Sequence, residues 1–225
     1  MGFTRAVLVV ALFLPARSAP ASSEGRATLA VHVRLEFDRS ITSGLIKTTA
    51  MDEAAAIWKM YGVELLWVDC DVRPGLFLDA VVERDRDRSL NHREALVLGS
   101  TTVAAGQPLQ QIRVSFDALG SLIGRSDREG WLQERDLATA LGRVLAHEIG
   151  HILLGAPAYH DPAGLMRATI PAADLARCPR SCFRLTPQSA TRLQRRKAFY
   201  NAEIAEIAEF SIEPENTLRS PRSLR

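Results

Sequence analysis

The sequence lacks several features that would each point to a particular class of protein. Its formal net charge is only +2, which gives no reason to expect nucleic acid or an acidic membrane surface as a partner. It contains no internal repeat and no apolar run of the ~20 residues that a membrane-spanning helix needs. What remains is a chain of 225 residues, 47% hydrophobic and 24% charged, values typical of one globular domain.

Cysteine is also scarce, because only Cys70, Cys178 and Cys182 occur. The chain has no second cysteine pair, which argues against a structural zinc site built on thiolates. In an exported protein, three cysteines suggest one disulfide and one free thiol. Cys178 and Cys182 are close enough to close a small loop, Cys70 can pair with either, and all three can instead be reduced and packed.

The first residues have the pattern of a secretory signal. Arg5 supplies a positive charge, the apolar stretch Ala6–Leu14 follows, and Pro15 ends it before a run of small residues. Cleavage after Ser18 or Ala21 would place small side chains at both recognition positions. We therefore expect residues 1–21 to be a cleaved signal peptide. The mature chain would then be secreted or periplasmic, with no stable insertion in a membrane.

Hydrophobic periodicity predicts a mixture of strands and helices. Alternating apolar positions predict strands, and apolar positions three, four and seven apart predict helices. The predicted strands are Leu29–Phe37, Val63–Val68 and Leu76–Val82, with Ala95–Leu98 and Gln111–Phe116 as two further candidates. The predicted helices are residues 42–61, Trp131–Leu154 and Pro187–Phe210.

The ends of the two later helices carry their own signals. Ser126 or Asp127 can cap the first of them and Gly155 ends it, whereas Thr186 and Pro187 begin the second. The mixed-charge stretch 83–88 is expected to be a solvated loop. We expect one folded domain over residues 22–210, followed by a disordered polar tail over 211–225.

The stretch His147-Glu148-Ile149-Gly150-His151 lies inside the predicted helix Trp131–Leu154. Residues four apart share one face of a helix, so His147 and His151 can direct their imidazoles at one metal ion. Zinc commonly takes such ligands, at about 2.0–2.1 Å. Glu148 would then lie beside the metal, where its carboxylate can take a proton from the attacking water.

A catalytic zinc ion normally has a third protein ligand, and the residues after this helix supply candidates. Gly155 lets the chain turn, His160 follows it, and Met166 comes six residues later. The stretch 147–166 resembles the metzincin metallopeptidases, whose signature is His-Glu-x-x-His-x-x-Gly-x-x-His followed by a methionine-containing turn. Here the glycine comes one residue late and the third histidine three residues late, so the resemblance is to a divergent or minimal member.

The resemblance implies one catalytic Zn²⁺ held by His147, His151 and His160, with Glu148 as general base and Met166 as an apolar floor. Other third ligands remain open. The adjacent Asp161 is one, and carboxylates downstream are others: Asp174, Glu203, Glu206 and Glu209. Tyr159 can stabilise an oxyanion, but a loop tyrosine more often packs, and we assign it no role.

The resemblance also implies an α+β fold, in which a small, twisted, mixed sheet packs on the active-site helix and a C-terminal helix follows. An edge strand would bind an extended peptide through main-chain hydrogen bonds, and either Ala95–Leu98 or Gln111–Phe116 would fill that role. The expected activity is a zinc-dependent endopeptidase acting on peptide or protein substrates. A non-catalytic zinc-binding protein of the same fold is the alternative. The basic stretch 192–197 is expected to be a solvated helix face rather than a nucleic-acid site.

Overall fold

The fold was analysed in a computed structural model, which describes residues 28–70, 75–84, 97–104, 107–124, 130–155 and 159–210. Several predictions lie outside these residues: the signal peptide, most of the charged loop 83–88, the helix cap at 126–127 and the C-terminal tail. At the start of that predicted loop, residue 83 belongs to a strand instead. Within the described part of the chain, no helix is both long and apolar enough to cross a bilayer.

The centre of the molecule is a five-stranded mixed sheet with the strand order β2-β1-β3-β5-β4. Four strands are parallel to one another: β2 (Val63–Trp67), β1 (Leu29–Phe37), β3 (Leu76–Glu83) and β5 (Gln107–Ser115). The edge strand β4 (Gly99–Ala104) is antiparallel to β5. Burial alternates along β1, where Leu29, Val31 and Val33 are fully buried. This period of two is the physical basis of the sequence prediction, which is confirmed for β1, β2 and β3.

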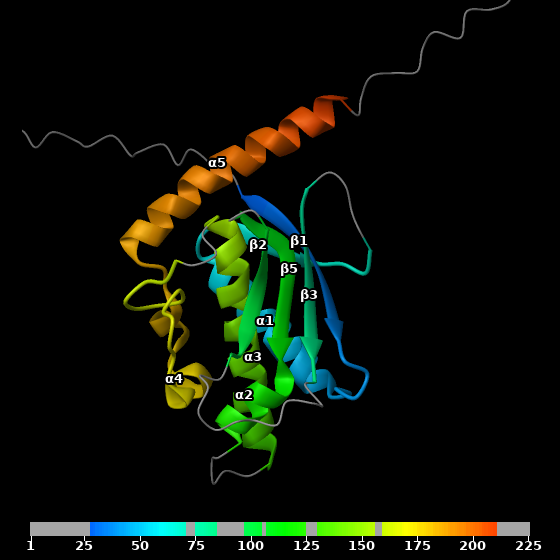
Figure 1. The fold of residues 1–225 in the computed structure, drawn as a ribbon, viewed down its shortest axis with the longest axis vertical. Coiled ribbons are helices and arrows are strands. Elements are labelled where there is room, and N and C mark those ends of the chain that lie inside the picture. Colours follow the sequence, from blue (N-terminus) through cyan, green and yellow to red (C-terminus); the bar gives the residue numbers. More distant parts are fainter. Residues whose placement is uncertain are drawn as a thin grey trace, which may run out of the picture.

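Helices α1 (Gly44–Lys59) and α3 (Gly130–Leu153) pack against each other and against the sheet (Figure 1). The Trp58 indole of α1 is fully buried and donates a hydrogen bond to the Ala146 carbonyl of α3 at 3.1 Å. Gly142 allows the close approach of the two helices, because an added Cβ would lie 2.5 Å from the Ala50 carbonyl oxygen. Both helices were predicted, and each begins or ends within two residues of its expected bounds.

The two weaker strand predictions need correction. The strand that pairs with β5 begins at Gly99, whereas Val97 and Leu98 of the predicted Ala95–Leu98 are not in a strand. Strand β4 was missed because its residues, Gly-Ser-Thr-Thr-Val-Ala, show no apolar alternation. Strand β5 is longer than predicted, and it ends at Ser115 because Ser115 caps a short helix, α2 (Phe116–Ile123), by accepting a hydrogen bond from the Ala118 amide.

A buried arginine attaches the segment after residue 170 to α3. This segment forms the short helix α4 (Ala172–Arg177) and the 3-10 turn η1 (Arg180–Phe183), neither of which was predicted. Arg143 donates to the carbonyls of Asp174, Leu175 and Cys178, and to Glu53 of α1 at 2.9 Å. Because the guanidinium satisfies carbonyls at the end of α4, the segment has a fixed position beside α3.

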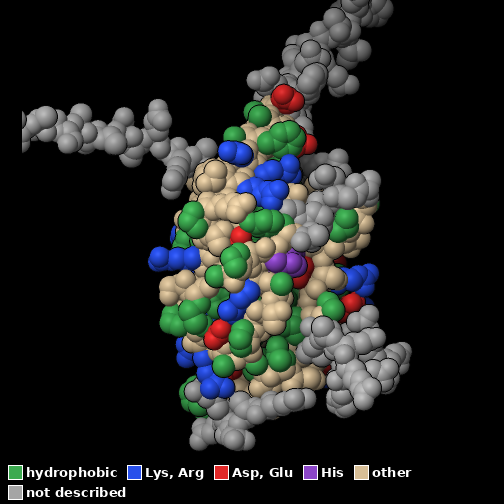
Figure 2. Space-filling model, turned by 60° about the vertical axis from the view of Figure 1, so that its left-hand side comes forward, with side chains coloured by type: hydrophobic (Ala, Val, Ile, Leu, Met, Phe, Trp, Pro, Cys, Tyr) green, Lys and Arg blue, Asp and Glu red, His purple; other side chains and the backbone are tan. Residues whose placement is uncertain are grey.

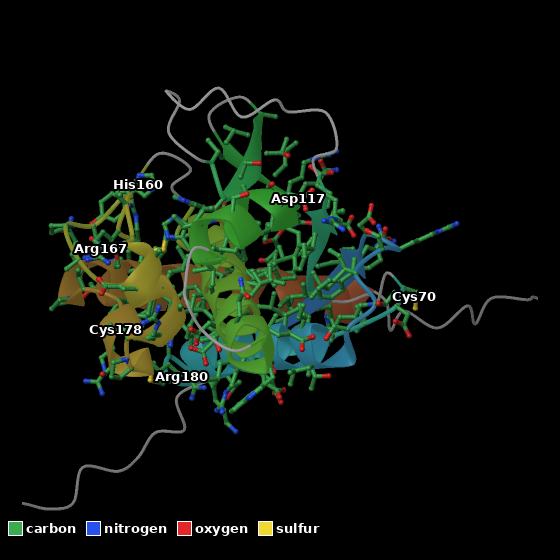
Figure 3. All side chains as sticks on the ribbon, turned by 90° about the horizontal axis from the view of Figure 1, so that it is seen from below. Cys70, Asp117, His160, Arg167, Cys178 and Arg180 are labelled. Carbon is green, nitrogen blue, oxygen red and sulfur yellow. A yellow bond between two sulfur atoms is a disulfide. The ribbon has the colours of Figure 1, made fainter. Side chains whose placement is uncertain are left out.

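The cysteine prediction is confirmed as one disulfide and one free thiol. Cys178 and Cys182 form the disulfide, which spans the junction of α4 and η1. Cys70 is free and exposed, and Figure 3 shows it on the opposite side of the molecule from Cys178.

The last helix, α5 (Pro187–Phe210), runs across one end of the sheet (Figure 1). Thr186 caps it as predicted, because its hydroxyl accepts a hydrogen bond from the Ser189 amide at 3.3 Å. The buried Lys197 ammonium donates to the Tyr61 carbonyl at 3.0 Å and ties α5 to the turn after α1. The structure thus has the predicted mixed sheet, the long helix that carries the motif and a C-terminal helix.

Candidate metal centre

Three histidines converge at the C-terminal end of α3. One ring nitrogen from each of His147, His151 and His160 lies within 4.8 Å of the other two. The Nε2 atoms of His147 and His151 are 3.1 Å apart, as expected for residues one helical turn apart. His160 comes from the loop after α3, where Figure 3 labels it, and Figure 2 shows histidine side chains reaching the surface.

The hydrogen bond of His147 prepares it for metal binding. Its Nδ1 lies 2.7 Å from the Leu165 carbonyl oxygen, which can only accept, so Nδ1 carries the proton. Nε2 is then unprotonated and faces the other two imidazoles. The pKa of His147 is lowered to about 4, mainly by burial and in smaller part by the neighbouring His151 and His160, whereas the Leu165 hydrogen bond acts in the opposite direction. The ring is therefore neutral near pH 7, which is the form that binds a metal ion.

Glu148 projects from the same turn of α3 toward strand β4. Only 5% of it is exposed, and its Oε2 lies 2.9 Å from the Thr101 hydroxyl, which donates to it. Burial raises the pKa of Glu148 to about 7, and the Thr101 hydrogen bond acts in the opposite direction. A carboxylate with a pKa near neutrality can both accept and return a proton under physiological conditions.

Strand β4 leaves room for the carboxylate because residue 99 is glycine. A Cβ added to Gly99 would lie 2.7 Å from Glu148 Oε1. Gly99 and Thr101 thus hold the carboxylate from two directions. Neither residue could be recognised from the sequence, because Thr101 precedes Glu148 by 47 residues and lies in a strand that was not predicted.

Met166 packs against the helical turn that carries the motif. It is fully buried, and its sulfur lies against the Cα of Gly150, where any added Cβ would overlap it. Gly150 stands between Glu148 and His151 in the motif, so the methionine packs directly under the helical turn that carries them. Gly155 follows the end of α3 and has a φ of 60°, a conformation that favours glycine.

The described carboxylates among the other candidate ligands do not belong to this cluster. Both carboxylate oxygens of Asp161 accept hydrogen bonds, one from Tyr159 at 2.7 Å and one from Ser189 at 2.6 Å. Asp174 forms an ion pair with Arg167 at 3.0 Å. Glu203 and Glu206 are exposed on α5, and the Glu209 side chain lies outside the described residues. Among the described residues, the three histidines are the group of three or more donors suited to a metal ion.

The donor set fits zinc. Three imidazoles around one point, with the Glu148 carboxylate on the same helical turn as the first of them, match the arrangement in which zinc keeps an open coordination position for catalysis. This is also the ligand set that the resemblance to metzincins implies. The structure thus brings together the three histidines that the sequence analysis named, two from α3 and one from the loop after it.

Comparisons with known proteins give weak similarities. No family model matches the chain, and no curated protein matches it. The structure is similar to archaemetzincin from Methanopyrus kandleri, with 12% identity, a TM-score of 0.44, and coverage of 78% of this chain and 98% of that one. It is also similar to a zinc-dependent peptidase from Methanocorpusculum labreanum, with 14% identity, a TM-score of 0.45, and coverage of 72% and 99%. Similarities this low leave the function to be inferred from the site itself.

Proposed function

We propose that the chain is an exported zinc-dependent endopeptidase. The observation that carries this proposal is the convergence of His147, His151 and His160 with the buried carboxylate of Glu148 beside them. The three imidazoles would hold the ion, and Met166 would support the helical turn from below. Glu148 would be the general base.

Different groups at the site would have different roles in the reaction. A zinc ion, when bound, polarises the scissile carbonyl and makes water a nucleophile near neutral pH. Glu148 takes the proton from the attacking water and gives it to the departing amine, because its carboxylate is close to the ligands and is not used as one. Thr101 keeps one oxygen of that carboxylate hydrogen-bonded, which limits the orientations that Glu148 can adopt.

Strand β4 is the proposed binding surface for the substrate. It is the edge of the sheet, with β5 on one side, and its Thr101 contacts Glu148 directly. An extended peptide added to this edge would form main-chain hydrogen bonds and pass beside the histidine cluster. The strand that we assign to this role is therefore β4, and neither Ala95–Leu98 nor Gln111–Phe116.

Export is supported by two features of the chain. Residues 1–21 have the three parts of a signal peptide. The Cys178–Cys182 disulfide is of a kind that persists in oxidising compartments such as the periplasm or the extracellular space. Fractionation of cells expressing the full chain would check this part: the mature protein should lack the first residues and be absent from the cytoplasm.

Purified mature protein provides the main test of the proposed activity. We expect about one zinc per chain and cleavage of a fluorescently labelled, unfolded protein, which stops when a chelator removes zinc and resumes when zinc is restored. Glu148→Gln should retain zinc and lower kcat by about 10²–10⁴-fold. Near-normal cleavage by this variant would contradict the role of Glu148. Zinc binding without cleavage of any peptide in a diverse library would favour a non-catalytic zinc-binding protein.

A further inference from the structure

The three histidines are held in different ways. His151 lies on α3 with only 5% of it exposed, and the half-buried His147 is fixed by the Leu165 carbonyl. His160 is exposed and belongs to a loop, so packing against the core does not fix its side chain. Its position depends on the backbone of the loop, and the residues that hold that backbone are therefore important for the site.

Asp161, the residue directly after His160, is the main anchor of this loop. Only 5% of it is exposed, and its carboxylate bridges two hydroxyl groups. The Tyr159 hydroxyl donates to Oδ1 at 2.7 Å, and the Ser189 hydroxyl donates to Oδ2 at 2.6 Å. A buried carboxylate is costly unless it is hydrogen-bonded, and here both oxygens have a donor.

Ser189 comes from the first turn of α5 and is fully buried. Its hydrogen bond therefore joins the C-terminal helix to the residue beside His160, across 28 positions of sequence. The Asp161 amide also donates to the Met166 carbonyl at 2.8 Å, which closes the loop over the methionine beneath the site. Asp161 is thus fixed through its side chain to α5 and through its main chain to Met166.

We propose that Asp161 and Ser189 are positioning residues for the third histidine ligand, and that α5 thereby sets the metal affinity of the site. This inference rests on the proposed zinc site. The proposed reaction leaves both residues unused, and neither belongs to the three proposed ligands. Their effect is to hold the backbone of His160 where its imidazole meets the pair on α3. Residues that orient a ligand in this way typically change metal affinity by about 10–100-fold when they are removed.

The test is the zinc affinity of the full chain, measured by competition with a chromophoric chelator. Ser189→Ala and Asp161→Asn should each raise the Kd for zinc by about 10–100-fold. Lys197→Met is the matched control, because it breaks another buried contact of α5, to the Tyr61 carbonyl, about two helical turns after Ser189. The control should lower the melting temperature and leave the zinc Kd within about twofold of wild type.

A double-mutant cycle separates positioning from general loss of stability. In a His160→Ala background, Ser189→Ala should no longer weaken zinc binding, because the ligand through which it acts is gone. Cobalt(II) provides a spectroscopic readout: the absorption bands of the Ser189→Ala protein should shift toward those of His160→Ala, and those of Lys197→Met should match wild type. If Ser189→Ala and Asp161→Asn do not fold, Tyr159→Phe removes one hydroxyl from the same carboxylate and should weaken zinc binding by a smaller factor.

The outcomes distinguish the inference from the proposed function. Equal zinc affinity in wild type, Ser189→Ala and Tyr159→Phe would overturn the inference and leave the zinc site intact. The same is true if Ser189→Ala weakens binding equally with and without His160. A folded wild-type chain that binds no zinc would overturn both.

Discussion

The two sources of the proposed zinc ligands differ in how the protein holds them. Helix α3 carries His147 and His151 within a segment that is buried almost completely from Ala138 to Leu153. The loop that follows carries His160 at the surface, fixed through its neighbour Asp161. Packing in the core already orders the backbone of α3, so holding two ligands there costs little additional conformational entropy. The loop has to be tied to a second element, α5, to bring in the third ligand.

The strongest test of this contrast removes one ligand from each source. His151→Ala and His160→Ala should both raise the Kd for zinc strongly, so that well under one ion per chain stays bound in a purified sample, although binding remains measurable at higher free zinc. Only His151→Ala should also destabilise the zinc-free protein, by about 1–3 kcal/mol, because it removes a buried side chain. Zinc analysis and thermal unfolding in chelator would measure the two effects. Equal stability losses would show that the loop is as much a part of the core as the helix.

Adding zinc should affect the two sources unequally. At free zinc of about 1,000 times Kd, binding stabilises the folded chain by up to about 4 kcal/mol. The amides of Asp161 and Leu165, which close the loop, should gain protection from hydrogen exchange on zinc binding, whereas those in the middle of α3 should change little. Hydrogen exchange with and without zinc would check this. If only the amides of α3 gained protection, zinc would be stabilising the helix rather than the loop, and the prediction would be wrong.

Two glycines of α3 can be substituted to perturb the helix at different places. Gly150 lies within the motif, and Gly142 lies at the contact with α1. Alanine normally stabilises a helix interior by about 1 kcal/mol relative to glycine. At Gly142 an added Cβ would lie 2.5 Å from the Ala50 carbonyl oxygen, so Gly142→Ala should instead destabilise by about 1–3 kcal/mol. At Gly150 the obstacle is the flexible Met166 side chain, so the stability loss should be smaller but zinc binding should weaken. Denaturant unfolding and zinc affinity of both variants would separate these outcomes.

The smallest expected effect concerns the hydrogen bond between β4 and Glu148. Thr101→Val keeps the shape of the side chain and removes the hydroxyl that donates to the carboxylate. We expect kcat to fall about tenfold, equivalent to about 1.4 kcal/mol, with zinc content unchanged. Thr101→Ser retains the hydroxyl and should stay close to wild type. A change in KM alone would instead place Thr101 in substrate binding.

The parts of the molecule that the sequence predicted are those in which periodicity and burial coincide. Strand β1 alternates because one face meets the core, and α3 shows apolar positions along its length for the same reason. The motif residues share one helix, so their mutual positions followed from helical geometry. Strand β4 escaped prediction because polar residues and glycine fill it, and α2 and α4 are too short for a clear period.

The supporting residues of the site could not be predicted because they are distant in sequence. Thr101 meets Glu148 only because β4 lies at the edge of the sheet nearest α3, an order that depends on all the strand pairings. Ser189 meets Asp161 only because α5 folds back over the loop. Nothing in either residue's neighbours in the chain signals the contact. Such partners become visible once the tertiary arrangement is known.

The proposed ligands His147, His151 and His160 all lie within fourteen consecutive residues, and this has a consequence for the denatured chain. Closing so short a loop around an ion costs little conformational entropy, so the unfolded protein is expected to bind zinc as well. That affinity subtracts from the stabilisation that zinc gives the native state. Ion capture by this local segment does not require the long-range pairing of the parallel strands. The contacts of Thr101 and Ser189 form only when the sheet and the last helix have assembled.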